Sequence, residues 1–246
     1  MNIRPVQISD ISDLQEFMPR ASCVFGSQLA RTWQIENQVK ESVTAFLYGE
    51  GESASNYIFV AYENAQLMGM LELHTLIGYG INCLSYSRSK ALHRSDMLSV
   101  CHEQQVITLD QGLLGQHSLA LCVVANGRES LAKDLISAAL GFLASGQDKF
   151  SGHICVSLPV SSGEHFWRVT GLPLTGISYQ DCNHHHAELL PQTPLYECFL
   201  DGALLTADSN DALHEPLAIW LRQQGFIDSA RLSVFDGGPI LTRLLG

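Results

Sequence analysis

A strand–helix–strand unit in the middle of the chain constrains the fold more than any other feature of the sequence. The run HSLALCVVA (117–125) is the most apolar stretch and indicates a buried strand, and HICVSLP (153–159) indicates a second one. Between them, residues 129–145 place apolar side chains at helical spacing after a polar turn at 126–128. Because strands joined through a helix are parallel, with a right-handed crossover, the sequence predicts one parallel βαβ unit.

The segments before this unit indicate antiparallel structure. NYIFVAYEN (56–64) and QLMGMLELHTL (66–76) are strand-like runs with no room for a crossover between them, so they predict a hairpin. A strand at 3–6 and helices at 11–18 and 30–48 precede the hairpin. The predicted fold class is α+β, with a mixed, mostly antiparallel sheet flanked by helices and one parallel crossover.

The remaining segments are predicted with less detail. Residues 77–98 are rich in Gly, Ser and Asn, and their apolar residues follow neither helical nor strand spacing. The other expected elements are a strand at 101–109, short elements at 164–171, 177–181 and 193–200, a helix at 211–224, and a strand at 230–236.

Composition narrows the class of protein. The 246 residues suffice for one large domain, and we expect a single domain over 1–246. A net charge of −11 repels nucleic acid and favours cationic small molecules. No apolar run is long enough for a membrane span, and the start lacks a secretion signal, so we expect a cytoplasmic protein with no membrane partner. The seven scattered cysteines contain no CxxC pair, which argues against a disulfide framework or a thiolate metal site.

Four stretches of the sequence carry a resemblance to a known family. They are IRPVQISDISDL at the start, AELLPQTPLY (187–196), LHEPLAIWLRQQGF (213–226) and VFDGGPIL (234–241). Together they resemble arginine N-succinyltransferase, an acyl-CoA N-acyltransferase of the GNAT type. The resemblance implies succinyl transfer from succinyl-CoA to the α-amine of arginine or a related cationic amine. It also implies a CoA-binding core at 1–160, an acceptor side at 161–246, and no metal.

The resemblance assigns chemistry to particular residues. His214 matches the family's catalytic histidine, and a histidine suits this reaction because the amine must lose a proton and the thiolate benefits from gaining one. Leu121, Cys122 and Val123 match the strand whose backbone pairs with the pantetheine of coenzyme A. Their side chains are expected to be ordinary core residues.

The turn after that strand is the expected pyrophosphate site, because a helix N-terminus favours anions. Arg128 matches the family's arginine, but Leu131 and Lys133 replace glycines that would let the backbone close around the phosphates. We expect Leu131 to crowd the phosphates and Lys133 to supply charge. The altered loop, and the continuation of family members beyond the point matching Gly246, leave a second reading open: a catalytically silent relative that acts as a metabolite-binding or regulatory subunit.

Two other groups of residues have alternative readings. Asp236, in the turn Asp236-Gly237-Gly238-Pro239, is expected to bind the cationic acceptor, although a sharp turn alone would also explain the sequence. The cluster at 182–186, Cys-Asn-His-His-His, contains metal-ligand types, but adjacent histidines do not readily face one ion, so a solvated loop is favoured. The sequence does not determine the oligomeric state, and both a homo-oligomer and a hetero-oligomer are open.

Overall fold

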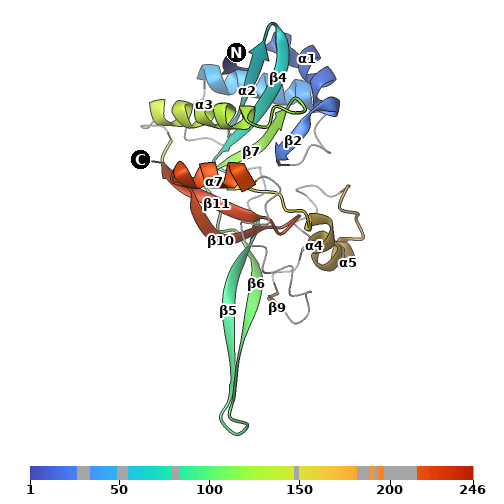
Figure 1. Ribbon diagram of the computed structural model, residues 1–246, viewed down its shortest axis with the longest axis vertical. Coiled ribbons are helices and arrows are strands. Elements are labelled where there is room, and N and C mark those ends of the chain that lie inside the picture. The colour runs from blue at the N-terminus through green and yellow to red at the C-terminus, as the bar shows by residue number, and fades with distance from the viewer. Residues whose placement is uncertain are drawn as a thin grey trace.

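A long mixed sheet runs through the protein, with helices on both faces of its first half and a projecting β-hairpin at the opposite end (Figure 1). The computed structural model describes residues 1–26, 34–48, 55–78, 84–146, 150–181, 189–190, 193–196 and 215–245. Within these residues, no helix is long and apolar enough to cross a membrane.

The strands and helices follow the chain in an alternating order. The strands are β1 (Asn2–Pro5), β2 (Ser22–Phe25), β3 (Ser55–Glu63), β4 (Gln66–Thr75), β5 (Ser85–Ser95), β6 (Val100–Asp110), β7 (His117–Val124), β8 (Gly152–Ser157), β9 (Leu195–Tyr196), β10 (Ile227–Ser233) and β11 (Pro239–Leu245). The helices are η1 (Ile8–Asp10), α1 (Ile11–Phe17), η2 (Met18–Arg20), α2 (Ile35–Tyr48), α3 (Leu131–Ser145), α4 (Gly163–Thr170), α5 (Leu172–Thr175) and α7 (Glu215–Gln223).

The strand pairing confirms the predicted fold class. Among the described residues the order is β1-β3-β4-β7-β8-β11-β10-β5-β6-β9, and β2 pairs with β7 off this path. Only β7 and β8 pair in parallel there, and α3 lies between them in sequence, as the βαβ pattern predicts. The β3–β4 hairpin is also confirmed, and its two-residue turn has positive φ at Asn64 and Ala65.

Two apolar layers hold the helices against the sheet. One face packs under α1 and α2 through a cluster that includes Leu14, Val39 and Leu121. The other face packs under α3 and α7 through a cluster that includes Leu135 and Leu221. The alternating directions of side chains along a strand explain how one sheet serves both layers. The central strands β4 and β7 are therefore enclosed on both sides.

The structure adds two features to the sequence prediction. Residues 77–98 contain a strand, β5, which forms a long regular hairpin with β6 from Ser85↔Asp110 to Ser95↔Val100. The chain after the Asp236 turn forms β11, which inserts between β8 and β10 in the sheet. The sheet consequently continues well beyond the βαβ unit.

Candidate functional site

The central strand β7 is interrupted at Ala120. On β4, Glu72 and Leu73 are consecutive, whereas their partners on β7 are Leu121 and Leu119, so Ala120 is an extra residue in a β-bulge. Pairing between β7 and β8 extends from His117↔Ile154 to Leu119↔Val156 in the described residues and ends beside this bulge. Bulges redirect a strand and are common next to active sites. We place the candidate site around this break.

Strand β2 occupies the edge of β7 that follows the break. Ser22, Cys23 and Phe25 pair with Val124, Val123 and Cys122, respectively. Gly26 then passes so close to the bulge that an added Cβ would lie 2.3 Å from the Ala120 carbonyl oxygen. Its φ of +86° also favours glycine.

This pairing changes the expectation for the pantetheine site. Cys122 and Val123 do not present an open backbone edge in this structure, because β2 already hydrogen-bonds along it. Leu121 lies between the last residue paired with β8 and the first paired with β2, so it remains the candidate of the three for backbone contact. The expectation for their side chains is confirmed, since all three are buried.

A buried polar cluster lies on β4 opposite the bulge. The Nε2 atom of His74 and the Oε1 atom of Glu72 are 2.7 Å apart, and Asn56 Nδ2 donates to the same Oε1 at 2.8 Å. Glu72 is 1% exposed and His74 is 8% exposed. An ionised carboxylate can only accept a hydrogen bond, so the tautomer of His74 that pairs with an ionised Glu72 carries its proton on Nε2. This is the arrangement by which a carboxylate orients a histidine for proton transfer.

The cluster also contains an unused acceptor. Asn56 Oδ1 is buried and has no hydrogen-bond partner among the residues that the structure describes. Unpaired buried polar atoms are costly, so each one calls for an explanation such as a ligand. Sequence reasoning missed this cluster. The signal was Glu72 and His74 two apart in an apolar strand, which puts both on one buried face.

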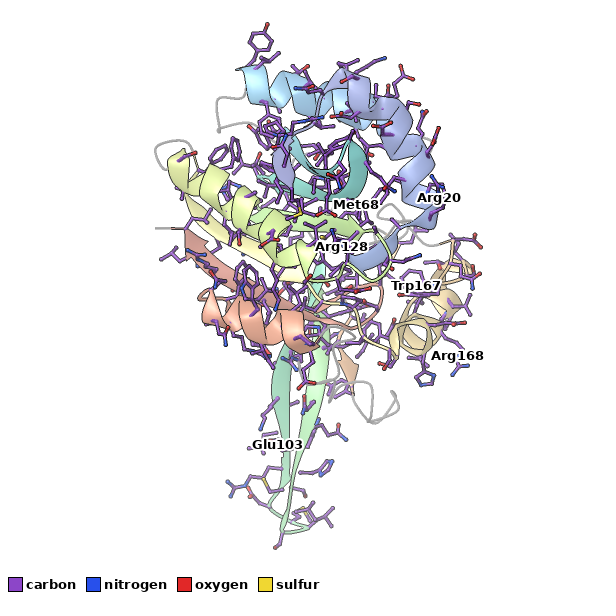
Figure 2. The ribbon with its side chains drawn as sticks, turned by 45° about the horizontal axis from the view of Figure 1, so that its top comes forward. Arg20, Met68, Glu103, Arg128, Trp167 and Arg168 are labelled. Carbon is purple, nitrogen blue, oxygen red and sulfur yellow. The ribbon has the colours of Figure 1, made fainter. Side chains whose placement is uncertain are left out.

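The loop after β7 has its cationic and backbone groups engaged with acidic side chains. Arg128 forms an ion pair with Glu63 at the end of β3, and the N–H of Gly127 donates to Glu129 Oε1 at 3.2 Å. Figure 2 shows Arg128 near Met68, where β7 ends and β4 begins. Lys133 is half-buried in the first turn of α3. A pyrophosphate would have to compete with two carboxylates here.

Leu131 does not have the predicted role. Its side chain is buried in the core, and its Cδ2 atom would lie 3.1 Å from a Cβ added to Gly69 on β4. The leucine therefore points into the sheet and does not crowd the phosphate approach. Leu131 is thus part of the core that packs α3 against the sheet.

A comparison with family models decides which family these features belong to. The model described as the arginine N-succinyltransferase beta subunit matches residues 1–245. The chain belongs to this arginine N-succinyltransferase family. Acyl transfer is the reaction that the family name states.

Individual relatives agree with the family match. The chain is 24% identical to arginine N-succinyltransferase subunit beta of Pseudomonas aeruginosa, over 98% of this chain and 76% of that protein. It is 22% identical to arginine N-succinyltransferase of Escherichia coli, over 98% and 75%, respectively. The solved structure of arginine/ornithine succinyltransferase subunit AI from Pseudomonas aeruginosa superposes with a TM-score of 0.82 at 21% identity, covering 99% of this chain and 76% of that one. That likeness supports the GNAT-like fold.

Some of the predicted arginine N-succinyltransferase site lies outside the described residues. His214 precedes α7, whose described part begins at Glu215, and the 182–186 cluster falls in another such segment. Both assignments therefore stay predictions. Across the described ranges, no group of three or more His, Cys, Asp or Glu residues could hold a metal ion.

Asp236 lies in the predicted sharp turn, between β10 and β11. Its Oδ1 accepts from the N–H of Gly238 at 3.0 Å, and the residue is 9% exposed. Burial raises the pKa of its carboxyl group, while hydrogen bonds from Ser233 and backbone N–H groups oppose that shift. An added Cβ on Gly238 would lie 2.0 Å from the Leu158 carbonyl oxygen, so the turn packs directly on the end of β8. These contacts support a role in the turn, and acceptor binding by Asp236 stays a prediction.

The thiols near the site have the predicted core character. Cys122 and Cys155 are buried in β7 and β8. Burial raises the pKa of the Cys122 thiol and raises that of Cys155 to about 11. Both thiols are therefore protonated near neutral pH and are poor nucleophiles.

Leu131→Ala should lower the free energy of unfolding by about 2–5 kcal/mol, because it empties a packed position against Gly69. Lys133→Ala, on the same turn, is the matched control and should change stability by about 0.5 kcal/mol or less. Urea denaturation followed by circular dichroism measures both. If both variants lost equally little free energy of unfolding, Leu131 would not be a core residue. The expectation that its side chain crowds the phosphates would then stand again.

Proposed function

We propose that this protein transfers an acyl group from a coenzyme A thioester to the amine of a small cationic molecule. Succinyl-CoA is the proposed donor, and the α-amine of arginine or a related amine is the proposed acceptor. The observation that carries the proposal is the buried Glu72–His74 pair opposite the Ala120 bulge, in a chain of the arginine N-succinyltransferase family. The acidic net charge also suits a cationic acceptor.

The proposed reaction removes two protons from the acceptor nitrogen and adds one to the departing sulfur, and two histidines would take part in these transfers. The acceptor arrives as an ammonium ion, and Nδ1 of His74 takes one of its protons while Glu72 stabilises the resulting imidazolium. The free amine then attacks the thioester carbonyl carbon, and the C–S bond breaks as the C–N bond of the amide is completed. The nitrogen of the adduct then loses one of its two remaining protons to solvent and keeps the other in the amide, and the departing sulfur gains a proton, for which His214 is the proposed donor. The proton held by His74 replaces the one that His214 gives. The products are an amide, CoA thiol and one proton released to solvent.

The donor site is proposed at the break between β7 and β8. Leu121 would offer its backbone to the pantetheine, and the bulge at Ala120 would supply a backbone N–H that is outside the regular ladder. Arg128 and Lys133 would bind the phosphates at the start of α3. Arg128 would leave its ion pair with Glu63 and form one with a phosphate instead. Asn56 Oδ1 would accept a hydrogen bond from the ammonium held at His74.

The contacts of the phosphate loop support a second candidate function, that of a catalytically silent relative. Glu129 accepts a hydrogen bond from the N–H of Gly127, and Glu63 forms an ion pair with Arg128. The loop therefore carries two carboxylates at the place where the negatively charged phosphates of coenzyme A would bind. This observation favours a silent relative that binds a metabolite or regulates a partner subunit. The two functions differ in whether a CoA thioester binds and is consumed.

An amine-dependent thiol assay tests the proposed function. The protein is incubated with succinyl-CoA, with and without arginine, and free thiol is followed with a chromogenic disulfide. Arginine-dependent release of thiol, with formation of the succinylated amine by mass spectrometry, supports transfer. Release at the same rate without any amine would instead indicate hydrolysis. No release with arginine, ornithine or lysine would favour the silent relative.

A further inference from the structure

A row of polar side chains crosses one face of the sheet. Side chains of directly paired residues on neighbouring strands point to the same face. The registered pairs are Asn56↔His74, His74↔Ser118, Ser118↔Cys155 and Cys155↔Thr242, on β3, β4, β7, β8 and β11. We call these five residues the polar row. His74, already placed in the candidate site, is thus one member of a longer feature.

The polar row interrupts a face that is otherwise apolar. On one side of the row, Ile58 and Met70 belong to the cluster that packs under α1 and α2. At the other end of the row, Ile240 packs against Cys155. Polar groups are costly at such positions unless they are hydrogen-bonded or used by a ligand. The row is therefore a candidate for a function beyond packing.

Ser118 is the accessible residue at the centre of the polar row. Its two neighbours there are buried, with His74 8% exposed and Cys155 3% exposed, whereas Ser118 is half-buried. Because the Cβ atoms of directly opposite residues on antiparallel strands are about 4.5–5.5 Å apart, the Ser118 hydroxyl and the His74 imidazole can contact the same ligand atom.

The Ser118 hydroxyl has capacity for a ligand. It hydrogen-bonds with the thiol of Cys155. A hydroxyl has one donor and two acceptor lone pairs, so a single hydrogen bond to a thiol leaves a lone pair for an N–H of a ligand.

Ser118 also lies close to the proposed donor site. The bulged residue Ala120 follows two positions later on β7, which is about 7 Å along a strand. Pairing of β7 with β8 ends between them, at Leu119. An amine held at Ser118 would therefore lie beside the break where the thioester is proposed to bind.

We propose that Ser118 binds the acceptor nitrogen and orients it for attack. This inference rests on the acyl transfer proposed above. One N–H of the acceptor ammonium donates to the Ser118 hydroxyl oxygen, and His74 takes a different proton from the same nitrogen. The nitrogen then keeps two hydrogens, one of them still bound to Ser118, and its lone pair points at the thioester carbon. Ser118 itself forms no covalent bond.

The test compares Ser118→Thr with Ser118→Val, which have the same shape and differ in the hydroxyl. Both side chains are β-branched and suit a strand. Ser118→Val should lower kcat/KM for arginine at least about tenfold relative to Ser118→Thr, because a hydrogen bond to a charged group is lost. The KM for succinyl-CoA should be the same in both. Thr242→Val, at the far side of Cys155, is the matched control and should have wild-type kinetics.

Equal kcat/KM for the Thr and Val variants would overturn the proposal, as would an equal loss in Thr242→Val. If Ser118→Val does not fold, Ser118→Ala takes its place in the comparison with Ser118→Thr. If the wild type releases no thiol with any amine, the proposed function fails, and calorimetric titration with arginine tests Ser118 separately. Arginine should then bind the Val variant more weakly than the Thr variant. Equal affinity, or no binding of arginine to the wild type, would contradict the role of Ser118.

Discussion

His74→Gln should lower turnover by roughly 10²-fold or more while the fold is retained, because it removes the proposed base. A glutamine amide can still donate to Glu72, so the buried carboxylate keeps a partner and the variant isolates proton transfer from packing. Steady-state thiol release with succinyl-CoA and arginine provides the measurement. Exposed His102, on β6, supplies the control His102→Gln, which should have wild-type turnover.

Glu72→Gln completes the test of this pair. If Glu72 only positions His74, the variant should retain partial turnover and show an altered dependence of kcat/KM on pH, since the histidine loses its carboxylate partner. A merely structural role would lower stability without moving that pH profile. Unchanged turnover in His74→Gln, with the fold confirmed, would remove His74 from the mechanism.

His214→Ala should also lower turnover by roughly 10²-fold or more, because the departing thiolate would lose its proposed proton donor. The two histidines are distinguished by pH dependence. Loss of a general base should remove the acidic limb of the profile of kcat/KM against pH, and loss of a general acid should remove the alkaline limb. Thiol release by each variant, measured across the pH range in which both fold, tests the assignment.

A particular result would reverse the two roles. If His214→Ala loses the acidic limb and His74→Gln does not, His214 is the base, which the resemblance alone also allows. Full turnover in His214→Ala would exclude this histidine from the reaction and would leave the Glu72–His74 pair as the remaining candidate.

The βαβ unit and the β3–β4 hairpin were predictable because each depends on local pattern. Buried strands such as β7 are continuous apolar runs, and α3 repeats apolar residues at helical spacing. The β5 strand was not predictable, because its sequence SYSRSKALHRS lacks an alternating apolar face. Its regularity comes from pairing with β6, which the local sequence of β5 does not reveal.

The candidate site was predictable only in part. Family resemblance identifies Arg128 and His214, but the ion pair between Arg128 and Glu63 joins residues 65 positions apart and required the fold. The pairing of β2 with Cys122 and Val123 also required the fold, because the sequence of a strand does not show whether another strand pairs with its edge. Leu131 was misread because the match to the family's phosphate loop was given more weight than the helical spacing, which puts Leu131 on the same apolar face of α3 as Leu135.

Calorimetric titration of the protein with coenzyme A and with succinyl-CoA tests the central claim most directly. The account predicts one binding site per chain, with weaker binding after Arg128→Ala or Lys133→Ala, because each removes a positive charge from the start of α3. Native mass spectrometry of the purified protein, which detects co-purified coenzyme A, provides an independent check. No detectable binding of either ligand at millimolar concentration, by a protein whose fold is confirmed, would contradict the acyltransferase account and leave the silent relative.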